Sequence, residues 1–449
     1  MTKTTRTGKR LLVAATALMP FGAPAFAQTA TPAPAAPAAP AAPAAPAQWQ
    51  DGVTFGLQIE GGIVGNPASP ANGINYGQLF TDKSNDFQLN QVLATIQRPL
   101  DPKATGYDFG FKLQGMIGTD ARYTRWTNFG KGQSGTRVQG DIVEANVLVH
   151  TPWFTSGGVD FKVGLYSTPI GAETIDPSTN SFYSHSYIFN FGIPLKHAGG
   201  YLTWHASDLV DLYAGADSGV NTTFGSGDNN GSASFMGGIG LNMMGGDLTV
   251  LALTHIGPEN PNRGPGAVVG ANNYNREIGD VVVTWKATKE LTLMTELNYI
   301  HDDNPNITTA NGASANGASA YGIAQYIGYA VNDSLTLNAR LEVFRDTKNF
   351  FVSAFPGNNT YNAAESGYAL TPAYSVQGNS GVTYGEITLG VTYKPSLDAL
   401  KLPGTLMIRP EIRYDTALSG VRPFNRSATT GVGKDTGAFT ISSDFVWTF

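Results

Sequence analysis

Residues of opposite charge stand at positions where they could act on a charged solute. One segment, residues 164–199, carries the acidic residues Glu173 and Asp176. Basic residues stand in two later segments, on the polar face of what we expect to be strands: Arg340, Arg409 and Arg413. If the two sets faced each other across a water-filled passage, they would create a transverse field that orients dipolar solutes and filters ions. The chemistry predicted is therefore electrostatic selection, with an acidic side and a basic side.

Further charged residues fall on the same polar faces and are additional candidates: Lys112, Lys162, Glu342 and Glu411. Glu342 and Glu411 interleave with the arginines along their segments. The alternative is therefore that these groups simply pair with one another.

Signs of catalysis or of metal binding are weak. The 6 histidines lack metal-ligand spacing along the chain. Ser184-His185-Ser186 is too close in sequence to form a catalytic triad by itself, and the chain contains no phosphate-binding glycine loop. We expect no enzyme activity, no metal site and no cofactor.

The elements that must position these residues follow a period of two. In residues 335–346, Leu337, Leu341 and Val343 alternate with Arg340 and Glu342. Alternation of this kind predicts strands with one apolar face and one polar face. The expected strands are 53–64, 86–97, 107–118, 138–149, 158–166, 197–206, 209–217, 233–244, 247–256, 277–287, 291–301, 320–331, 335–346, 382–394, 404–415 and 437–449.

The connections between these strands are alternately long and short. Only 14% of the residues are charged, and no apolar run reaches the roughly 18 residues of a membrane helix. Short turns at one end and long loops at the other are typical of a transmembrane antiparallel up-and-down β-barrel. We expect an all-β barrel of about 16 strands, with 14 and 18 as alternatives, short periplasmic turns and long extracellular loops.

The N-terminus indicates export. A basic start is followed by a short apolar stretch and by Ala25-Phe26-Ala27, so residues 1–27 are predicted to be a signal peptide cleaved after Ala27. Residues 28–47 are rich in Ala and Pro and form an expected extended periplasmic linker. Residues 48–449 make the barrel, which places the protein in the outer membrane of a diderm bacterium.

The overall charge excludes one class of partner. The chain carries a net charge of −6 and no Cys, and removal of the basic leader makes the mature chain more negative. Nucleic-acid binding is therefore not expected. The negative charge weakly favours cations as permeants.

The segment 164–199 and the wider strand pattern resemble the β-barrel porin-2 (OmpL-like) family of bacterial outer-membrane proteins. The family motif is matched at Gly164, Pro169, Gly171, Ala172, Glu173, Asn180, Tyr183, Ser184, Ser186, Pro194, His197 and Gly199. His185 stands where the family usually has Arg, which puts a charge-based role of that position in doubt. The resemblance covers residues 48–449 and implies a porin-like channel.

Residues 167–196 form the third long loop of this chain. In general porins the third loop folds into the pore. We therefore expect this loop to narrow a lumen, and the function expected is passive diffusion of small hydrophilic solutes or ions. The alternative is a non-conducting structural or adhesive barrel that displays long surface loops. Expected partners are outer-membrane lipid and lipopolysaccharide, the barrel-insertion machinery through the terminal Phe449, and two further copies in a homotrimer.

Overall fold

The computed structural model describes residues 48–126, 129, 133, 136–262, 269–303, 317–352, 381–398, 401–427 and 432–449. The expected signal peptide and the Ala/Pro-rich linker lie outside the described residues, and both remain predictions. Among the helices of the described part, none has the length and apolar character needed to cross a membrane.

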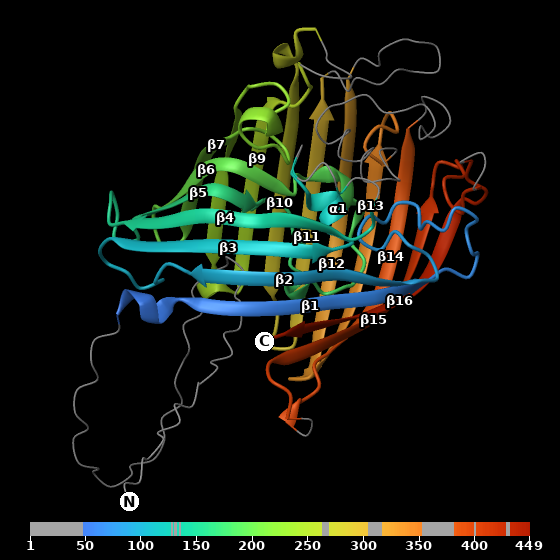
Figure 1. Cartoon of the computed structure of the whole chain (residues 1–449), viewed down its shortest axis with the longest axis horizontal. Helices are drawn as coiled ribbons and strands as arrows, with labels where there is room; N and C mark the ends of the chain where they lie inside the picture. Colours follow the sequence, from blue (N-terminus) through green and yellow to red (C-terminus); the bar gives the residue numbers. More distant parts are fainter. Residues whose placement is uncertain are drawn as a thin grey trace, which may run out of the picture.

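Sixteen strands form one closed antiparallel barrel, in which each strand pairs with its neighbours in sequence and β1 pairs with β16 (Figure 1). Figure 1 shows the strong tilt of the wall, with β1–β4 running across the view and β10–β14 running steeply. The strands are β1 (Thr54–Gly65), β2 (Phe87–Arg98), β3 (Asp108–Gly118), β4 (Gln139–Thr151), β5 (Val159–Ser167), β6 (Lys196–His205), β7 (Val210–Asp217), β8 (Ser234–Met243), β9 (Leu248–Pro258), β10 (Asn275–Lys286), β11 (Leu291–Asp302), β12 (Ala318–Asn332), β13 (Leu335–Asp346), β14 (Val382–Tyr393), β15 (Thr405–Ala417) and β16 (Gly437–Thr448).

The sequence prediction of sixteen strands is confirmed, and every predicted boundary lies within about two residues of the observed one. The largest differences, of two residues each, are the later ends of β4, β9 and β15 and the earlier starts of β10 and β12. All except the one at β4 are extensions toward the long connections, where turn residues rather than periodicity set the predicted limit. The alternation of long and short connections is also confirmed.

In the strands, apolar side chains are exposed and charged side chains are buried, which is the reverse of the pattern in a water-soluble protein. Along β13, Leu337 and Leu341 are 46% and 43% exposed on the outer surface, whereas Arg340 and Glu342 are 0% and 3% exposed. Strands β15 and β16 alternate in the same way. An apolar outer face and a polar inner face suit a wall between hydrocarbon and a polar interior.

The end of the chain closes the barrel. Ile59 of β1 lies opposite Trp447 of β16. The terminal Phe449 donates its N–H to the carbonyl of Leu57 at 2.8 Å and accepts from the Leu57 N–H at 2.7 Å. Closure satisfies the backbone groups that an open sheet edge would leave unpaired in lipid.

Three long connections contribute an apolar cluster inside this wall. We name them loop 1 (residues 66–86), loop 2 (119–138) and loop 3 (168–195). Their buried aromatic side chains are Tyr76, Phe80, Tyr123, Phe182, Tyr187, Phe189 and Phe191. The Tyr187 ring stacks on that of Tyr384 of β14, with the centroids 4.9 Å apart. Part of the barrel interior is therefore packed with side chains from these loops.

The outer face gives a first testable prediction. Leu341 lies in the middle of β13 and is exposed on the outside, so Leu341→Arg should destabilise the membrane-inserted barrel by about 2–4 kcal/mol. The matched control is Leu418→Arg, because Leu418 is exposed just beyond the end of β15, where the cost is expected to be about 0–1 kcal/mol. Urea unfolding in lipid vesicles measures both; equal costs would show that β13 does not face lipid.

Candidate functional site

Loop 3 is attached to the inner wall through its own backbone. Glu342 of β13 accepts the N–H groups of residues 187 and 188 at 2.7 and 2.8 Å. Glu411 of β15 accepts those of residues 183 and 184 at 3.0 and 3.1 Å. A buried backbone N–H must find a partner, and here wall carboxylates provide it. The two glutamates therefore hold the loop rather than simply pairing with the arginines beside them.

Arg340 of β13 ties loop 3 to two strands at once. Its guanidinium lies 2.7 Å from the Glu173 carboxylate and donates to the Ser184 carbonyl at 2.8 Å. On the wall it pairs with Glu386 of β14, at 3.1 Å between Nε and Oε2. Because the side chain is fully buried, the planar guanidinium is well suited to satisfy all these acceptors together.

Arg409 and Arg413 of β15 act on the loop in a related way. Arg409 donates to the carbonyls of residues 177 and 180 at 2.8 and 2.9 Å, and it pairs with Asp444 of β16. Arg413 donates to the carbonyl of residue 185 at 2.6 Å and pairs with Asp415. The arginines thus bind loop carbonyls on one side and wall carboxylates on the other.

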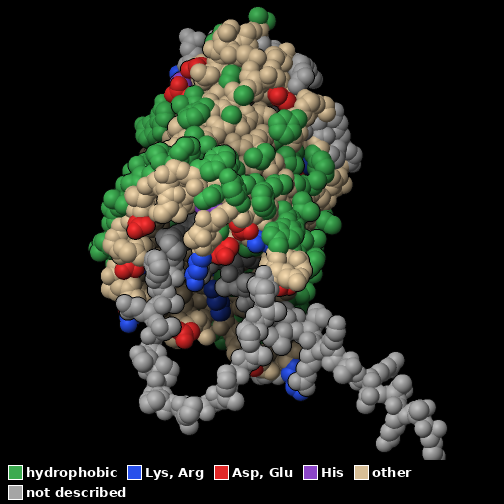
Figure 2. Space-filling view, turned by 90° about the vertical axis from the view of Figure 1, so that its left-hand side faces the viewer, with side chains coloured by type: hydrophobic (Ala, Val, Ile, Leu, Met, Phe, Trp, Pro, Cys, Tyr) green, Lys and Arg blue, Asp and Glu red, His purple; other side chains and the backbone are tan. Residues whose placement is uncertain are grey.

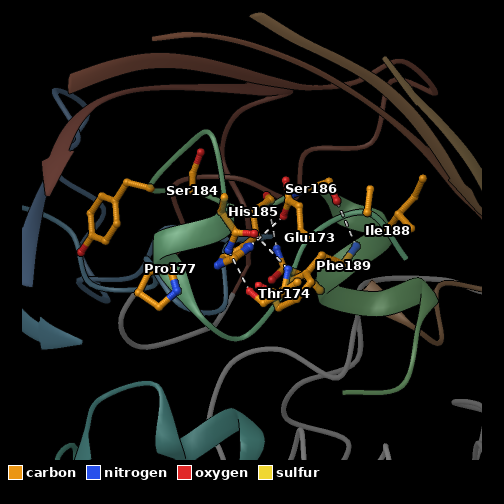
Figure 3. A network of polar contacts seen from close by, with 12 residues as sticks. Glu173, Thr174, Pro177, Ser184, His185, Ser186, Ile188 and Phe189 are labelled. Carbon is orange, nitrogen blue, oxygen red and sulfur yellow. Dashed lines mark hydrogen bonds and ion pairs between the residues drawn. The ribbon is translucent and has the colours of Figure 1, made fainter. Parts of the chain in front are cut away.

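Glu173 and His185 form the centre of the polar network shown in Figure 3. His185 Nδ1 lies 2.7 Å from a Glu173 oxygen, which also accepts the Ser186 N–H at 3.1 Å. The imidazole stacks on Phe189 with 4.1 Å between the centroids. His185 therefore serves to fold the loop on itself.

The titration of this pair follows from its surroundings. Burial by itself raises the pKa of Glu173, but Arg340 and His185 outweigh burial and lower the pKa to about 2. Burial lowers the pKa of His185 below its ordinary value, although Glu173 opposes that shift. At pH 7 His185 is therefore neutral, and Arg340 supplies the charge that keeps Glu173 ionised.

Asp176 has a different role from Glu173. Its side chain accepts the Ser178 N–H at 2.9 Å and so caps η3 (Pro177–Thr179), a short 3-10 turn of loop 3. The same oxygen accepts from the Gln58 amide of β1 at 2.9 Å. The structure therefore places Asp176 as a capping residue, separate from the ion pairs of Glu173.

The geometry of the charged residues differs from the expected one. The sequence predicted an acidic row facing a basic row across a gap, whereas Arg340 contacts Glu173 directly and all three arginines bind loop 3. The physical reason is that buried arginines need hydrogen-bond acceptors and a negative counter-charge. Loop 3 supplies both, through its backbone carbonyls and the carboxylate of Glu173. The assignment of these residues to a pore constriction stays a prediction.

Lys112 and Lys162 lie on β3 and β5, across the ring of strands from β13. Lys112 pairs with Glu144 of β4 at 3.3 Å. Lys162 lies 5.8 Å above the ring of Tyr201. These lysines are therefore separated from the arginine side, and they remain candidates for the opposite wall of a passage.

The remaining motif residues of loop 3 shape its path. Pro169 is the second residue of loop 3 after β5. Gly171 has a φ of +95°, and an added Cβ there would lie 2.5 Å from Ile193. Tyr183 is buried and donates its hydroxyl to Asn90 at 2.9 Å. His197 stands apart, at the start of β6, where it meets Asp217 of β7 and His255 of β9.

Several acidic residues that the sequence analysis missed complete the network: Glu60, Glu296, Glu386, Asp415 and Asp444. Each lies on the polar face of its strand, so the same alternation that identified Arg340 could have identified them. The grouping of His197 with Asp217 and His255 could not be inferred from sequence spacing, because these residues come from three strands.

Comparisons with known proteins agree with this architecture. The model of a family described as "Putative beta-barrel porin-2, OmpL-like" matches residues 52–449, whereas no curated protein matches the chain.

Porins are among the solved structures that share the fold. OprB of Pseudomonas putida has a TM-score of 0.51 at 14% identity and covers 89% of this chain and 95% of its own. OmpF of Salmonella typhi in complex with daunomycin has a TM-score of 0.52 at 10% identity, covering 90% and 99%. The anion-selective porin from Comamonas acidovorans has a TM-score of 0.51 at 9% identity, covering 88% and 99%. At these identities the likeness shows the fold.

The titration of Glu173 gives a testable prediction. Because its pKa in the folded protein, about 2, lies below the ordinary 4.5, its contribution to stability is complete above about pH 4.5 and is lost as the pH falls toward 2. The contribution is at most about 3 kcal/mol. Urea unfolding between about pH 6 and pH 3 should therefore show a steeper loss for the wild type than for Glu173→Gln. Asp208→Asn, in the exposed β6–β7 turn, serves as the control; parallel curves for wild type and Glu173→Gln would contradict the assignment.

Proposed function

Because this chain belongs to the β-barrel porin-2 (OmpL-like) family, we propose that it lets small hydrophilic solutes and ions diffuse passively across the outer membrane. The observation that carries the proposal is the closed barrel of sixteen strands with a polar inner face. Barrels of 16–18 strands are wide enough to leave an aqueous channel. In Figure 2 charged side chains gather in a hollow bordered by hydrophobic side chains of the outer wall.

We propose loop 3 as the element that narrows this passage. It is fixed to the arginine side of the wall by the contacts of Arg340, Arg409 and Arg413. A passage would then run between loop 3 and the opposite wall, where Lys112 and Lys162 lie. No catalytic step is part of this proposal, and the barrel acts as a non-enzymatic channel.

We further propose a preference for cations. Even without Glu60 and Glu342, the buried carboxylates around loop 3 outnumber the three arginines that they surround: Glu173, Glu386, Glu411, Asp415 and Asp444. An excess of carboxylates along a polar pathway lowers the energy of a permeating cation relative to an anion. The net charge of −6 on the whole chain acts in the same direction.

The partners of such a channel follow from its place in the membrane. Outer-membrane lipid and lipopolysaccharide would contact the apolar outer face, and the barrel-insertion machinery would bind the terminal strand that ends at Phe449. We include a homotrimer in the proposal by analogy with general porins.

Planar-bilayer recording tests the proposal. The purified barrel should give stable single-channel steps, and its reversal potential in a KCl gradient should show K⁺ permeating more readily than Cl⁻. Lys112→Gln should strengthen that preference, because it removes a partly exposed charge and frees Glu144. Lys286→Gln, at the exposed end of β10, is the matched control. The absence of any stable conductance in the wild type would sink the proposed function.

A non-conducting structural barrel is the second candidate, and one observation favours it. The aromatic cluster formed by loops 1–3 fills part of the interior. If the cluster closed the passage, the wild type would show no conductance, and a variant shortened in loop 1 would conduct. If the cluster leaves the passage open, the wild type conducts and the shortened variant conducts more.

A further inference from the structure

Three side chains that can bind a metal ion converge inside the barrel, next to the start of loop 3. They are His197 at the start of β6, Asp217 at the end of β7 and His255 near the end of β9. His197 Nδ1 lies 3.1 Å from Asp217 Oδ2, and His255 Nε2 lies 3.0 Å from Asp217 Oδ1. All three side chains are fully buried. One carboxylate is thus placed between two imidazoles, away from water.

Hydrogen bonding leaves this cluster incomplete. Although His197 Nδ1 and Asp217 Oδ2 are close, they are not aligned as a hydrogen bond. Within the described part of the chain, neither atom has a hydrogen-bond partner, and neither does His255 Nδ1. Buried polar atoms without partners are costly and uncommon, and each requires an explanation. A cation bound by His197 Nδ1, Asp217 and His255 Nε2 would provide one for His197 Nδ1 and Asp217 Oδ2.

Neighbouring groups already hold the three side chains in position for such an ion. Thr168 Oγ1 lies 3.0 Å from His197 Nε2 and can accept its proton, which leaves Nδ1 with its lone pair directed at the cluster. Gly219 donates its N–H to Asp217 Oδ1 at 2.8 Å. Tyr166 stacks on the His197 ring. Metal-binding histidines are commonly oriented by a hydrogen bond of this kind at the other ring nitrogen.

The strand register brings the residues this close. Gly199 of β6 lies directly opposite Asp217 of β7. An added Cβ at Gly199 would approach the Asp217 Cα to 2.5 Å, so only glycine allows this approach. The His197-Ala198-Gly199 sequence therefore supplies both a ligand and the space for its partner.

We propose that His197, Asp217 and His255 form a binding site for a divalent transition metal of the Zn²⁺ class. Two imidazoles and one carboxylate are the N and O donors that such ions prefer. Bond lengths of about 2.0–2.1 Å place tetrahedral ligand atoms roughly 3.3 Å apart. Here each imidazole lies 3.0 or 3.1 Å from a different oxygen of Asp217, and one ligand atom from each of the three residues lies within 4.8 Å of the others. The ion links β6, β7 and β9 beside loop 3. The site is independent of whether the barrel conducts.

A second histidine–aspartate group in the barrel is built differently. At the opposite ends of their strands, near the short turns, His150 and His205 approach Asp160 at 2.6 and 3.3 Å. The Asp160 side chain is 29% exposed, so water can complete its hydrogen bonding. We therefore assign the metal to the buried group alone.

Metal retention in the untagged barrel tests the proposal. The chain is folded into detergent micelles with Zn²⁺ present and then desalted, and bound Zn²⁺ is measured by mass spectrometry. The wild type should retain about one equivalent per chain. His255→Gln and Asp217→Asn should bind at least about 100-fold more weakly, since each loses a direct ligand. His301→Gln, outside the cluster, and the double variant His150→Gln/His205→Gln should retain the metal.

X-ray absorption at the zinc edge on the wild type keeps the test decisive if a variant fails to fold. The expected spectrum shows two imidazole nitrogens and at least one oxygen at the distances of a four-coordinate site. A wild-type barrel that retains no Zn²⁺ would overturn the proposal, and the cluster would then be a hydrogen-bonded triad. Loss of the metal in the His150/His205 double variant would also overturn it, because it would place the ion in the other group.

Discussion

A loop that enters a barrel takes its backbone away from water, and each buried N–H and C=O must then find a partner. In this protein the partners come from the wall. Glu342 and Glu411 accept backbone N–H groups of loop 3. The side chains of Arg340, Arg409 and Arg413 donate to backbone carbonyls of the same loop. The arginines are buried in turn, and Glu386, Asp415 and Asp444 neutralise them. The loop and strands β13–β16 are consequently one hydrogen-bonded unit, in which removing an arginine leaves buried wall carboxylates without their counter-charge.

This unit connects the fold to the proposed function. In the proposed channel, a loop fixed on one side of the barrel would set the width of the passage beside it, and the same side chains would give that passage its charge. The aromatic cluster of loops 1–3 adds stiffness, because Phe80, His185 and Phe189 pack ring against ring. If loop 3 is the proposed constriction, such packing favours a passage of fixed size over a mobile gate. The buried His197–Asp217–His255 group would stiffen the adjacent part of the wall.

The strands could be predicted from the sequence because a wall between lipid and a polar interior imposes a strict period of two. The same rule placed Arg340, Arg409 and Arg413 on the inner face. It could not show what they touch, since Glu173 and Arg340 are brought together by the path of loop 3 rather than by any local pattern. Asp176 illustrates the limit: the strand pattern could not show that this acidic residue of loop 3 caps a short 3-10 turn. The histidine cluster was missed for a similar reason, because barrel closure and register bring its three strands together.

The position of loop 3 on the inner wall is the central claim, and a cysteine pair tests it most directly. An added Cβ at Gly192 would lie 3.0 Å from Asn298 Cγ of β11. That Cγ atom stands roughly where the Sγ of a cysteine at position 298 would lie, so a disulfide, whose Cβ atoms are about 3.5–4.5 Å apart, is within reach. The chain has no Cys of its own. In the folded, vesicle-inserted barrel, Gly192→Cys/Asn298→Cys should form the disulfide under mild oxidation, whereas Gly192→Cys/Lys401→Cys should not. A barrel that remains fully reduced at the first pair would show that loop 3 does not lie against β11.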